Sequence, residues 1–180
     1  MICSTSPSSS RGAQSCFART SSRGRWWAAP RSTCARWSNL GACDLVLQVA
    51  PDLPSVFVDA RKIGHVFSNL VSNAAAHSKP GDEILIAANP QNGSVRFSVT
   101  DHGPGIPAEH QARLFERFFR VPGSDPRGAG LGLAIAREIV TAHGGQIGVN
   151  SLPGLGAEFY FVLPAARRGF RHETKHPDRR

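Results

Sequence analysis

The sequence predicts an α+β fold, a two-layer α/β sandwich in which helices cover one face of a mixed sheet. Residues 60–77 and 131–143 have apolar residues at helical spacing, and several other segments alternate apolar and polar residues as strands do. Few of these strands and helices follow one another in strict β-α-β order, which favours an α+β architecture. With 180 residues the chain is long enough for one ordinary domain with a core.

Residues 1–43 have a composition unlike that of a folded domain. They contain ten Ser, six Arg and all three Trp, but neither Lys nor an acidic residue, and they show no periodicity. An Arg- and Ser-rich, acid-poor stretch is typical of transit peptides, but Trp and Cys are unusual in a functional leader. We therefore interpret residues 1–43 as a disordered or misassigned leader that contributes nothing to stability. An ordered domain is expected over 44–164 and a basic tail over 165–180.

The ordered domain is expected to begin with extended segments and a long helix. In "DLVLQVA" the residues Leu45, Leu47 and Val49 alternate on one side, and "LPSVFVD" has the pattern of a second, shorter strand. Residues 60–77 follow with an apolar stripe at i, i+3, i+4, i+7, i+8 and i+11. The stripe consists of Ile63, Val66, Phe67, Leu70, Val71 and Ala74. Pro80 and Gly81 end this helix.

Strands and one further long helix make up the rest of the domain. "EILIAAN" and "SVRFSVTD" read as strands joined by the hairpin-like turn "PQNG". After "HGPGIP" we expect a short helix over residues 108–115, and "FRVPGSDPRGAG" has the Gly, Pro and charge content of a mobile loop. A helix over 131–143 and the strands "GQIGVNS" and "AEFYFVLP" complete the domain.

The net charge of +8 does not indicate a nucleic-acid partner. Residues 1–58 carry six Arg and two Asp, and residues 164–180 carry five Arg, one Lys, one Glu and one Asp. The intervening residues 59–163 contain nine basic and nine acidic side chains. Because the excess positive charge lies in the two tails and not on a face of the domain, we expect no nucleic acid to bind.

Cysteine spacing and hydropathy exclude two other classes. The four cysteines, Cys3, Cys16, Cys34 and Cys43, form no C-x-x-C pair, so neither a zinc site nor a disulfide framework is expected. The domain over 44–164 has no cysteine, which suits a reducing compartment. No apolar run approaches the ~20 residues that a membrane helix needs. We expect a cytoplasmic chain without a membrane segment, and leave membrane anchoring of a longer parent protein open.

Four polar residues form a row along the helix over 60–77. At 3.6 residues per turn, His65, Asn69, Asn73 and His77 lie on one side, at the border of the apolar stripe. Such a row is commonly a solvated shoulder of a helix. Asparagine also offers a neutral carbonyl oxygen that suits magnesium. Both interpretations remain open from the row alone.

An aspartate ends the strand in "VRFSVTDHGPGIP". Asp101 continues the face of Val95, Phe97 and Val99, so its carboxylate is expected to point towards the core, where an unpaired charge is costly. It is either a turn-capping residue or an acceptor for a ligand, and the glycines that follow would let the backbone approach that ligand.

Glycines also precede the second long helix, in "GAGLGLAIAREIV". Free amides at a helix N-terminus favour phosphate, and glycines keep side chains out of its path. The segment lacks the lysine of a Walker motif, and no β-α-β unit surrounds it as a dinucleotide-binding fold requires. Both familiar phosphate-loop folds therefore fit poorly.

Taken together and in this order, the three stretches resemble the N, G1 and G2 boxes of the histidine-kinase catalytic domain, which is related to gyrase and MutL. "LFERFFR" resembles the F box, and the segment from "GLGLAIAREIV" to "FYFVLP" resembles the usual end of that domain. The resemblance covers residues 44–164. It implies a layered sandwich that holds ATP between its helices, under a lid loop, with Mg2+ as the second cofactor.

The resemblance implies a role for each matching residue. Asn73 is implied as the magnesium ligand, with Asn69 one turn earlier supporting it, and these two are the candidate catalytic residues. Asp101 is implied as the acceptor for the adenine amine, and His77 occupies the place where many relatives carry an aromatic ring. Arg127 is a candidate lid cation. The other implied ATP-binding residues are Gly103, Gly105, Ile106, Arg120, Gly128, Gly130, Leu131, Gly132 and Leu133.

The chain departs from the family pattern at several positions. Ala76 stands where relatives commonly carry a cation, and Ala157 replaces a usual threonine. Gyrase-like ATPases place a water-activating glutamate where Asn69 stands, and an amide cannot be a general base. The resemblance therefore implies a site that keeps ATP from water until a histidine arrives.

The family's acceptor histidine is also missing, because residues 1–58 contain no histidine. We expect the chain to transfer the γ-phosphoryl group of ATP to a histidine on a dimerisation domain supplied elsewhere, and through it to a response regulator. An anti-sigma-factor-type serine kinase and a non-catalytic nucleotide-binding module are the alternatives.

Overall fold

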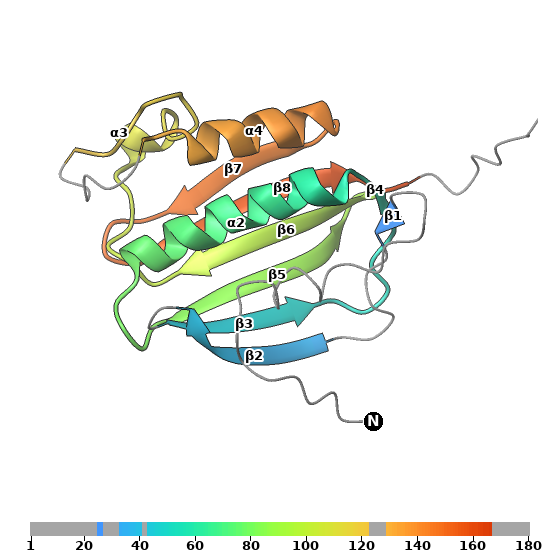
Figure 1. Ribbon diagram of the computed structural model, residues 1–180, viewed down its shortest axis with the longest axis horizontal. Helices are drawn as coiled ribbons and strands as arrows, with labels where there is room; N and C mark the ends of the chain where they lie inside the picture. The colour runs from blue at the N-terminus through green and yellow to red at the C-terminus, as the bar shows by residue number, and fades with distance from the viewer. Residues whose placement is uncertain (1–24, 27–32, 41–42, 123–128, 167–180) are drawn as a thin grey trace, which may run out of the picture.

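The computed structural model describes residues 25–26, 33–40, 43–122 and 129–166. In this part of the chain a six-stranded sheet has the order β2-β3-β5-β6-β8-β7 (Figure 1). Its strands, in chain order, are β2 (Thr33–Leu40), β3 (Cys43–Val49), β5 (Glu83–Gln91), β6 (Ser94–Asp101), β7 (Gln146–Ser151) and β8 (Ala157–Pro164). β3 and β5 are parallel and the other neighbours are antiparallel, so the sheet is mixed.

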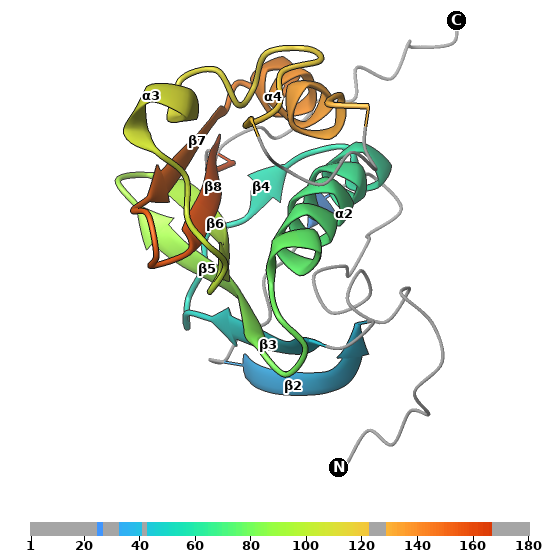
Figure 2. The ribbon, with the colours of Figure 1, turned by 90° about the vertical axis from the view of Figure 1, so that its left-hand side faces the viewer.

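Two long helices, α2 (Ala60–His77) and α4 (Gly132–Ala142), lie on the same face of this sheet (Figure 2). A short helix, α3 (Ala108–Gln111), lies near the start of α4 (Figure 1). The two layers confirm the α+β sandwich that the sequence predicts. Among the described residues no helix is both long enough and apolar enough to cross a bilayer.

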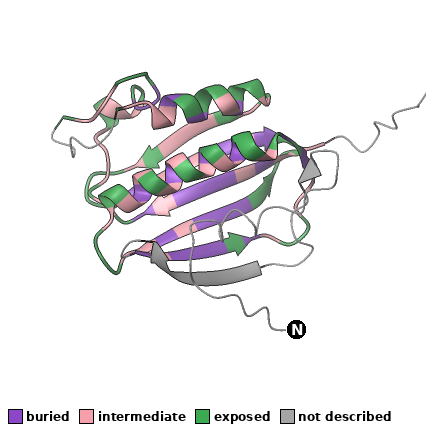
Figure 3. Ribbon diagram, in the orientation of Figure 1, coloured by how far each residue is buried: buried purple, intermediate pink, exposed green. Residues whose placement is uncertain are grey.

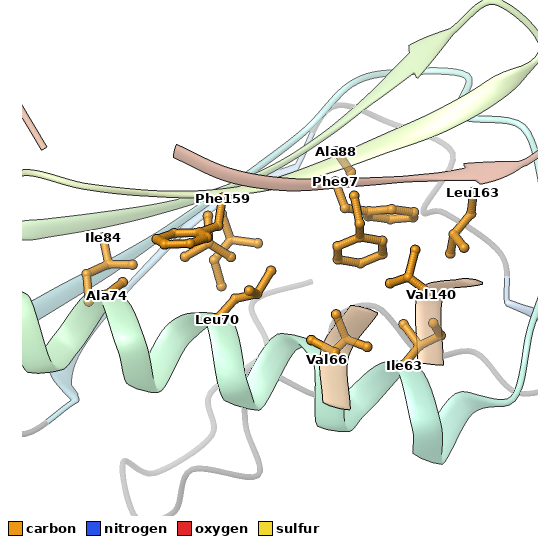
Figure 4. Packing of buried hydrophobic residues seen from close by; sticks show 14 of the residues in the cluster. Ile63, Val66, Leu70, Ala74, Ile84, Ala88, Phe97, Val140, Phe159 and Leu163 are labelled. Atoms are coloured by element: carbon orange, nitrogen blue, oxygen red, sulfur yellow. The ribbon is translucent and has the colours of Figure 1, made fainter. Parts of the chain in front are cut away.

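The core fills the space between the helical layer and the sheet. Alternate residues of the central strands are buried on the face towards the helices, as the purple segments of Figure 3 show. Phe97 of β6 stacks on Phe161 of β8 with ring centroids 5.0 Å apart, and Phe67 of α2 meets both rings edge-on. Figure 4 shows Leu70 of α2 and Phe159 of β8 in the same cluster.

α2 begins and ends at the residues that the sequence predicts. Asp59 caps the helix, because its Oδ1 accepts hydrogen bonds from the backbone N–H groups of Arg61 at 2.9 Å and Lys62 at 3.2 Å. At the other end the hydroxyl of Ser78 donates to the carbonyl oxygen of Ala74 at 2.8 Å. The buried residues of α2 are Ile63, Val66, Leu70 and Ala74, which belong to the predicted stripe.

The remaining strands follow the predicted segments with small shifts. β5 continues two residues beyond "EILIAAN", because Asn92 and Gly93 alone make the turn to β6, both with positive φ (44° and 73°). The short strand β4 (Val56–Phe57) occupies part of "LPSVFVD". The helix expected over 108–115 is shorter, since α3 ends at Gln111 and the chain turns so that Leu114 and Phe115 both enter the core.

Regular structure also occurs where the sequence predicts none. Within residues 1–43, β1 (Arg25–Trp26) pairs with β4, and β2 pairs antiparallel with β3, Thr33 opposite Val49. The free edge of β3 offers a row of backbone donors and acceptors, so a neighbouring segment can extend the sheet with little dependence on its side chains. The rest of the leader and most of the tail lie outside the described residues.

Truncation from the N-terminus tests the contribution of β2. We expect a chain that begins at residue 33 to keep the melting temperature of the full chain within about a degree. A chain that begins at residue 43 should melt several degrees lower, because a loss of about 1 kcal/mol shifts the melting temperature of a domain of this size by a few degrees. The measurement is thermal unfolding followed by circular dichroism. Identical melting of all three chains would show that β2 adds no stability.

Candidate functional site

Two asparagines of α2 lie at the border between core and solvent. Burial of Leu70 and Ala74 brings the residues just before them, Asn69 and Asn73, to the edge of the apolar stripe, where both are half-buried. Asn69 donates from Nδ2 to the carbonyl oxygen of Gly132 at 3.0 Å. This contact joins the middle of α2 to the start of α4, which a solvated shoulder would not do.

The other members of the row differ from one another. His65 and His77 are exposed, and nothing brings the His65 ring to the site. Asn73 is half-buried, and its amide has no hydrogen-bond partner among the described residues. The same part of the chain contains no group of three or more His, Cys, Asp and Glu residues that could hold a metal. The unpaired amide oxygen of Asn73 is a neutral, hard ligand of the kind that suits Mg2+.

Asp101 at the end of β6 is a buried carboxylate that is 3% exposed. Its Oδ1 accepts hydrogen bonds from the backbone N–H groups of Gly103 at 2.9 Å and Ala157 at 3.2 Å. Burial raises the pKa of the carboxyl group above its ordinary value, and these two bonds, with weaker help from His77 and His102, oppose the shift. Both bonds go to Oδ1, so Oδ2 has no donor among the described residues and remains available to a ligand.

The turn after Asp101 is held between the end of α2 and the β7–β8 connection. A Cβ atom on Gly103 would lie 2.7 Å from the carbonyl oxygen of His77, so only glycine fits there. Gly105 has φ +72°, and a Cβ atom on it would collide with the carbonyl group of Leu152. The backbone N–H of Ile106 donates to the Ser151 hydroxyl at 2.8 Å, which fixes the exit of the turn.

Sequence reasoning missed the contribution of the β7–β8 connection to this turn. Gly156 has φ +81°, and a Cβ atom on it would collide with the carbonyl oxygen of Asp101. The next residue, Ala157, supplies one of the two donors to the Asp101 carboxylate through its backbone. The paired glycines in "PGLGAEF" were the available signal. The departure at Ala157 leaves this backbone bond intact, because the side chain takes no part in it.

The segment between α3 and α4 is joined at its base. Phe118 donates its backbone N–H to the carbonyl oxygen of Gly130 at 2.9 Å. Gly130 has φ +67°, and a Cβ atom on it would lie 3.0 Å from the backbone of Phe118. Phe118 itself has φ +64°, an outlier for a bulky residue, and it is 72% exposed. Strain of this kind is typical of functional segments.

The remaining predicted residues fall into three groups. Leu131 occupies the N-cap position of α4 without a side-chain hydrogen bond to the helix, and Leu133 packs against the core. Arg120 is half-buried and interacts within the domain. Gly128 and Arg127 lie outside the described residues.

Along α2 the candidate groups have a fixed order. Gly132 and the start of α4 lie beside Asn69, and the turn at Gly103 lies beside His77. At a rise of 1.5 Å per residue the two contacts are about 12 Å apart, with Asn73 between them. The site therefore has a buried acceptor at one end, an unpaired amide in the middle and a helix start with glycines at the other.

A family described as histidine kinase-, DNA gyrase B- and HSP90-like ATPase matches residues 58–167. The alginate biosynthesis sensor protein KinB of Pseudomonas aeruginosa is 44% identical over 120 residues, which cover 67% of this chain and 20% of that protein. The adaptive-response sensory kinase SasA of Crocosphaera subtropica is 42% identical over 125 residues, or 68% of this chain and 33% of that protein. This chain thus spans between a fifth and a third of the length of these two curated relatives.

Among solved structures, the mycobacterial sensor histidine kinase MprB superposes with a TM-score of 0.64 at 32% identity, covering 69% of this chain and 84% of that one. Its fold and the matched segment agree with the order of elements described above. The chain therefore belongs to the histidine kinase-, DNA gyrase B- and HSP90-like ATPase family, and its domain is an ATP-binding one.

Proposed function

We propose that this chain is the ATP-binding catalytic domain of a two-component sensor histidine kinase. It transfers the γ-phosphoryl group of ATP to a histidine on a dimerisation domain, from which the group passes to a response regulator. The order of groups along α2 carries the proposal. In Mg-ATP the adenine base lies at one end and the phosphates, with their metal, lie at the other. Asp101 at one end of the site suits the base, and Asn73 and the start of α4 suit the metal and the phosphates. The likeness of this chain to a sensor histidine kinase of known structure favours histidine over serine as the acceptor.

The adenine base would be recognised through a hydrogen bond to the buried carboxylate of Asp101. The free Oδ2 of Asp101 accepts from the exocyclic amine. Gly103 and Gly105 let the turn after Asp101 pack closely against the backbone of His77 and Leu152, which fixes the surroundings of the carboxylate. Because Oδ1 is held by two backbone donors, the carboxylate cannot turn away from this position without breaking them.

Asn73, with Asn69 beside it, would hold Mg2+ at the phosphates. Bound magnesium supplies neutralisation of the charge on the β- and γ-phosphate oxygens. The asparagines would orient the phosphate chain, and the free backbone N–H groups at the start of α4, which follow Gly130, would donate to it. Transfer then depends on positioning and on charge, for which neutral amides suffice.

The same residues explain why water is a poor acceptor in the proposed reaction. Asn69 cannot remove a proton from water at neutral pH. Asp101 is the only buried carboxylate among the described residues, and the turn that follows it meets α2 at His77, about 12 Å along the helix from Asn69. ATP is therefore expected to survive until an acceptor histidine enters.

Substitution of the asparagines tests the transfer reaction. We expect Asn73→Ala to abolish transfer to an added histidine-bearing dimerisation domain, and Asn69→Ala to reduce it less. Asn69→Glu should add ATPase activity by placing a carboxylate near the phosphates. The assay combines labelled transfer with phosphate release, and the acid lability of the label identifies phosphohistidine. His65→Ala, in the same row but exposed, is the control and should behave as wild type. Full transfer by Asn73→Ala would contradict the role of the row.

Replacement of the buried carboxylate separates binding from stability. Asp101→Asn should weaken Mg-ATP binding at least tenfold, because a charge-assisted hydrogen bond contributes about 1.5–3 kcal/mol. The pKa of Asp101 is raised above its ordinary value of 3.8 in the folded protein, so the unfolded chain loses this proton first as pH rises. Above about pH 4, ionisation of Asp101 therefore lowers the stability of the wild-type protein. The free energy of unfolding of the variant relative to wild type should therefore increase between pH 4 and pH 7.

Calorimetry and urea unfolding measure these two effects. Glu109→Gln, which removes an exposed carboxylate, is the matched control and should leave ATP affinity unchanged. A folded Asp101→Asn variant with wild-type affinity would rule out the role of the carboxylate in binding.

A glycine substitution tests the base of the segment between α3 and α4. Gly130→Ala combines an unfavourable backbone conformation with a close approach to Phe118, whereas Gly154→Ala has φ +83° and open space around it. Both variants should lose about 1 kcal/mol of stability from the backbone term. Only Gly130→Ala should also bind Mg-ATP more weakly, by severalfold in calorimetry. Equal affinities for the two variants would show that this base does not contribute to binding.

A further inference from the structure

The C-terminal end of α4 is tied to the N-terminal end of α2 by His143. The backbone N–H of Asp59, the residue that caps α2, donates to Nε2 of the His143 ring at 3.1 Å. Nδ1 of the same ring lies 2.7 Å from the carbonyl oxygen of Ile139 in the last turn of α4. One imidazole therefore bridges the two helices through its two nitrogens.

The two partners fix the protonation state of the ring. A backbone N–H can only donate, so Nε2 carries no proton, and a carbonyl oxygen can only accept, so Nδ1 carries one. The bridge requires a neutral imidazole in this tautomer. Free histidine prefers the opposite tautomer, with the proton on Nε2, which makes the state of His143 distinctive.

A second polar contact joins the same two helices further along. Asn69 of α2 donates to the carbonyl oxygen of Gly132 at the start of α4. The distance along the helix axis from Asp59 to Asn69 is about 15 Å in α2, and the distance from Gly132 to His143 is about 16 Å in α4. The helices run antiparallel, and the matching spans let both contacts form at one register only.

Small side chains make up part of the apolar surface of α4. The buried residues of α4 are Ala134, Ala136 and Val140, two of which are small, and the larger Leu133 and Ile139 pack against the core. Specification of register is the best-attested role of polar contacts between packed elements. Gly145 lies against the carbonyl oxygen of Val162 in β8, which holds the end of α4 on the sheet while His143 reaches α2.

We propose that His143 is a positioning residue that sets the register of α4 along α2 and so holds the glycine-rich start of α4 beside Asn69 and Asn73. This inference rests on the proposed function. His143 touches no substrate: it acts through α4, whose first turn lies at the other end of the helix. Without the bridge, α4 keeps its local structure but loses one of the two polar contacts that fix its register on α2.

The first test is spectroscopic and needs no nucleotide. In nitrogen-15 NMR of the full chain at neutral pH, Nδ1 of His143 should be protonated and Nε2 unprotonated. The amide of Asp59 should exchange slowly in wild type and in His143→Gln, whose oxygen reaches the Nε2 position. It should exchange faster in His143→Asn, whose amide reproduces only the bond to Ile139. A proton on Nε2, or unchanged exchange in His143→Asn, would overturn the bridge.

The second test measures Mg-ATP affinity by calorimetry. His143→Asn should bind about tenfold more weakly than wild type, and His143→Gln within about twofold. Val140→Ala is the control for general destabilisation: it removes buried volume from α4 and should lower the melting temperature, yet keep affinity within about twofold. Loss of affinity in Val140→Ala equal to that in His143→Asn would overturn the positioning role, as would failure of His143→Asn to fold.

The outcomes distinguish this inference from the proposed function. Wild-type protein that does not bind Mg-ATP would overturn both. Wild-type binding together with normal affinity in His143→Asn would overturn the positioning role alone.

Discussion

The rotation of α2 about its own axis is the constraint on which the rest of the site depends. Burial of Ile63, Val66, Leu70 and Ala74 against the sheet allows the helix one orientation, because the apolar stripe is narrow and one-sided. In that orientation Asn69 and Asn73 lie at the edge of the core, half-buried and within reach of α4. The packing of these four apolar side chains therefore determines the direction in which the two asparagine side chains point. A residue inserted into α2 would rotate the asparagines by about 100° without changing their chemistry.

Much of this arrangement could be predicted, because it depends on local patterns. The stripe and the cap at Asp59 define α2, and alternation defines the strands. β2 was missed because its pairing with β3 uses backbone groups, which leave little trace in composition. The family resemblance proposed the asparagines and Asp101 as binding residues. It did not show that Ala157 donates to Asp101, or that His143 reaches Asp59, because both are contacts between residues more than 50 positions apart.

Several features of the site oppose the stability of the domain. The Asp101 carboxylate is buried with a raised pKa, and Phe118 is exposed in a left-handed backbone conformation. The stacked and edge-on contacts among Phe67, Phe97 and Phe161 lie in the adjoining core and offset such costs. Local departures from the best sequence for folding thus concentrate where ligand contacts are expected, as is usual for functional sites.

The unequal use of the two Asp101 oxygens has a consequence for discrimination between purine nucleotides. Oδ1 is committed to two backbone donors, so the ligand meets Oδ2 alone, an acceptor that cannot become a donor while the group is ionised. In the proposed site an amino group at the facing edge of the base would complete this pair, whereas the oxygen that guanine presents there would meet a second acceptor. Under the proposed function, repulsion of the wrong base added to attraction of the right one would make GTP a poor competitor for this domain.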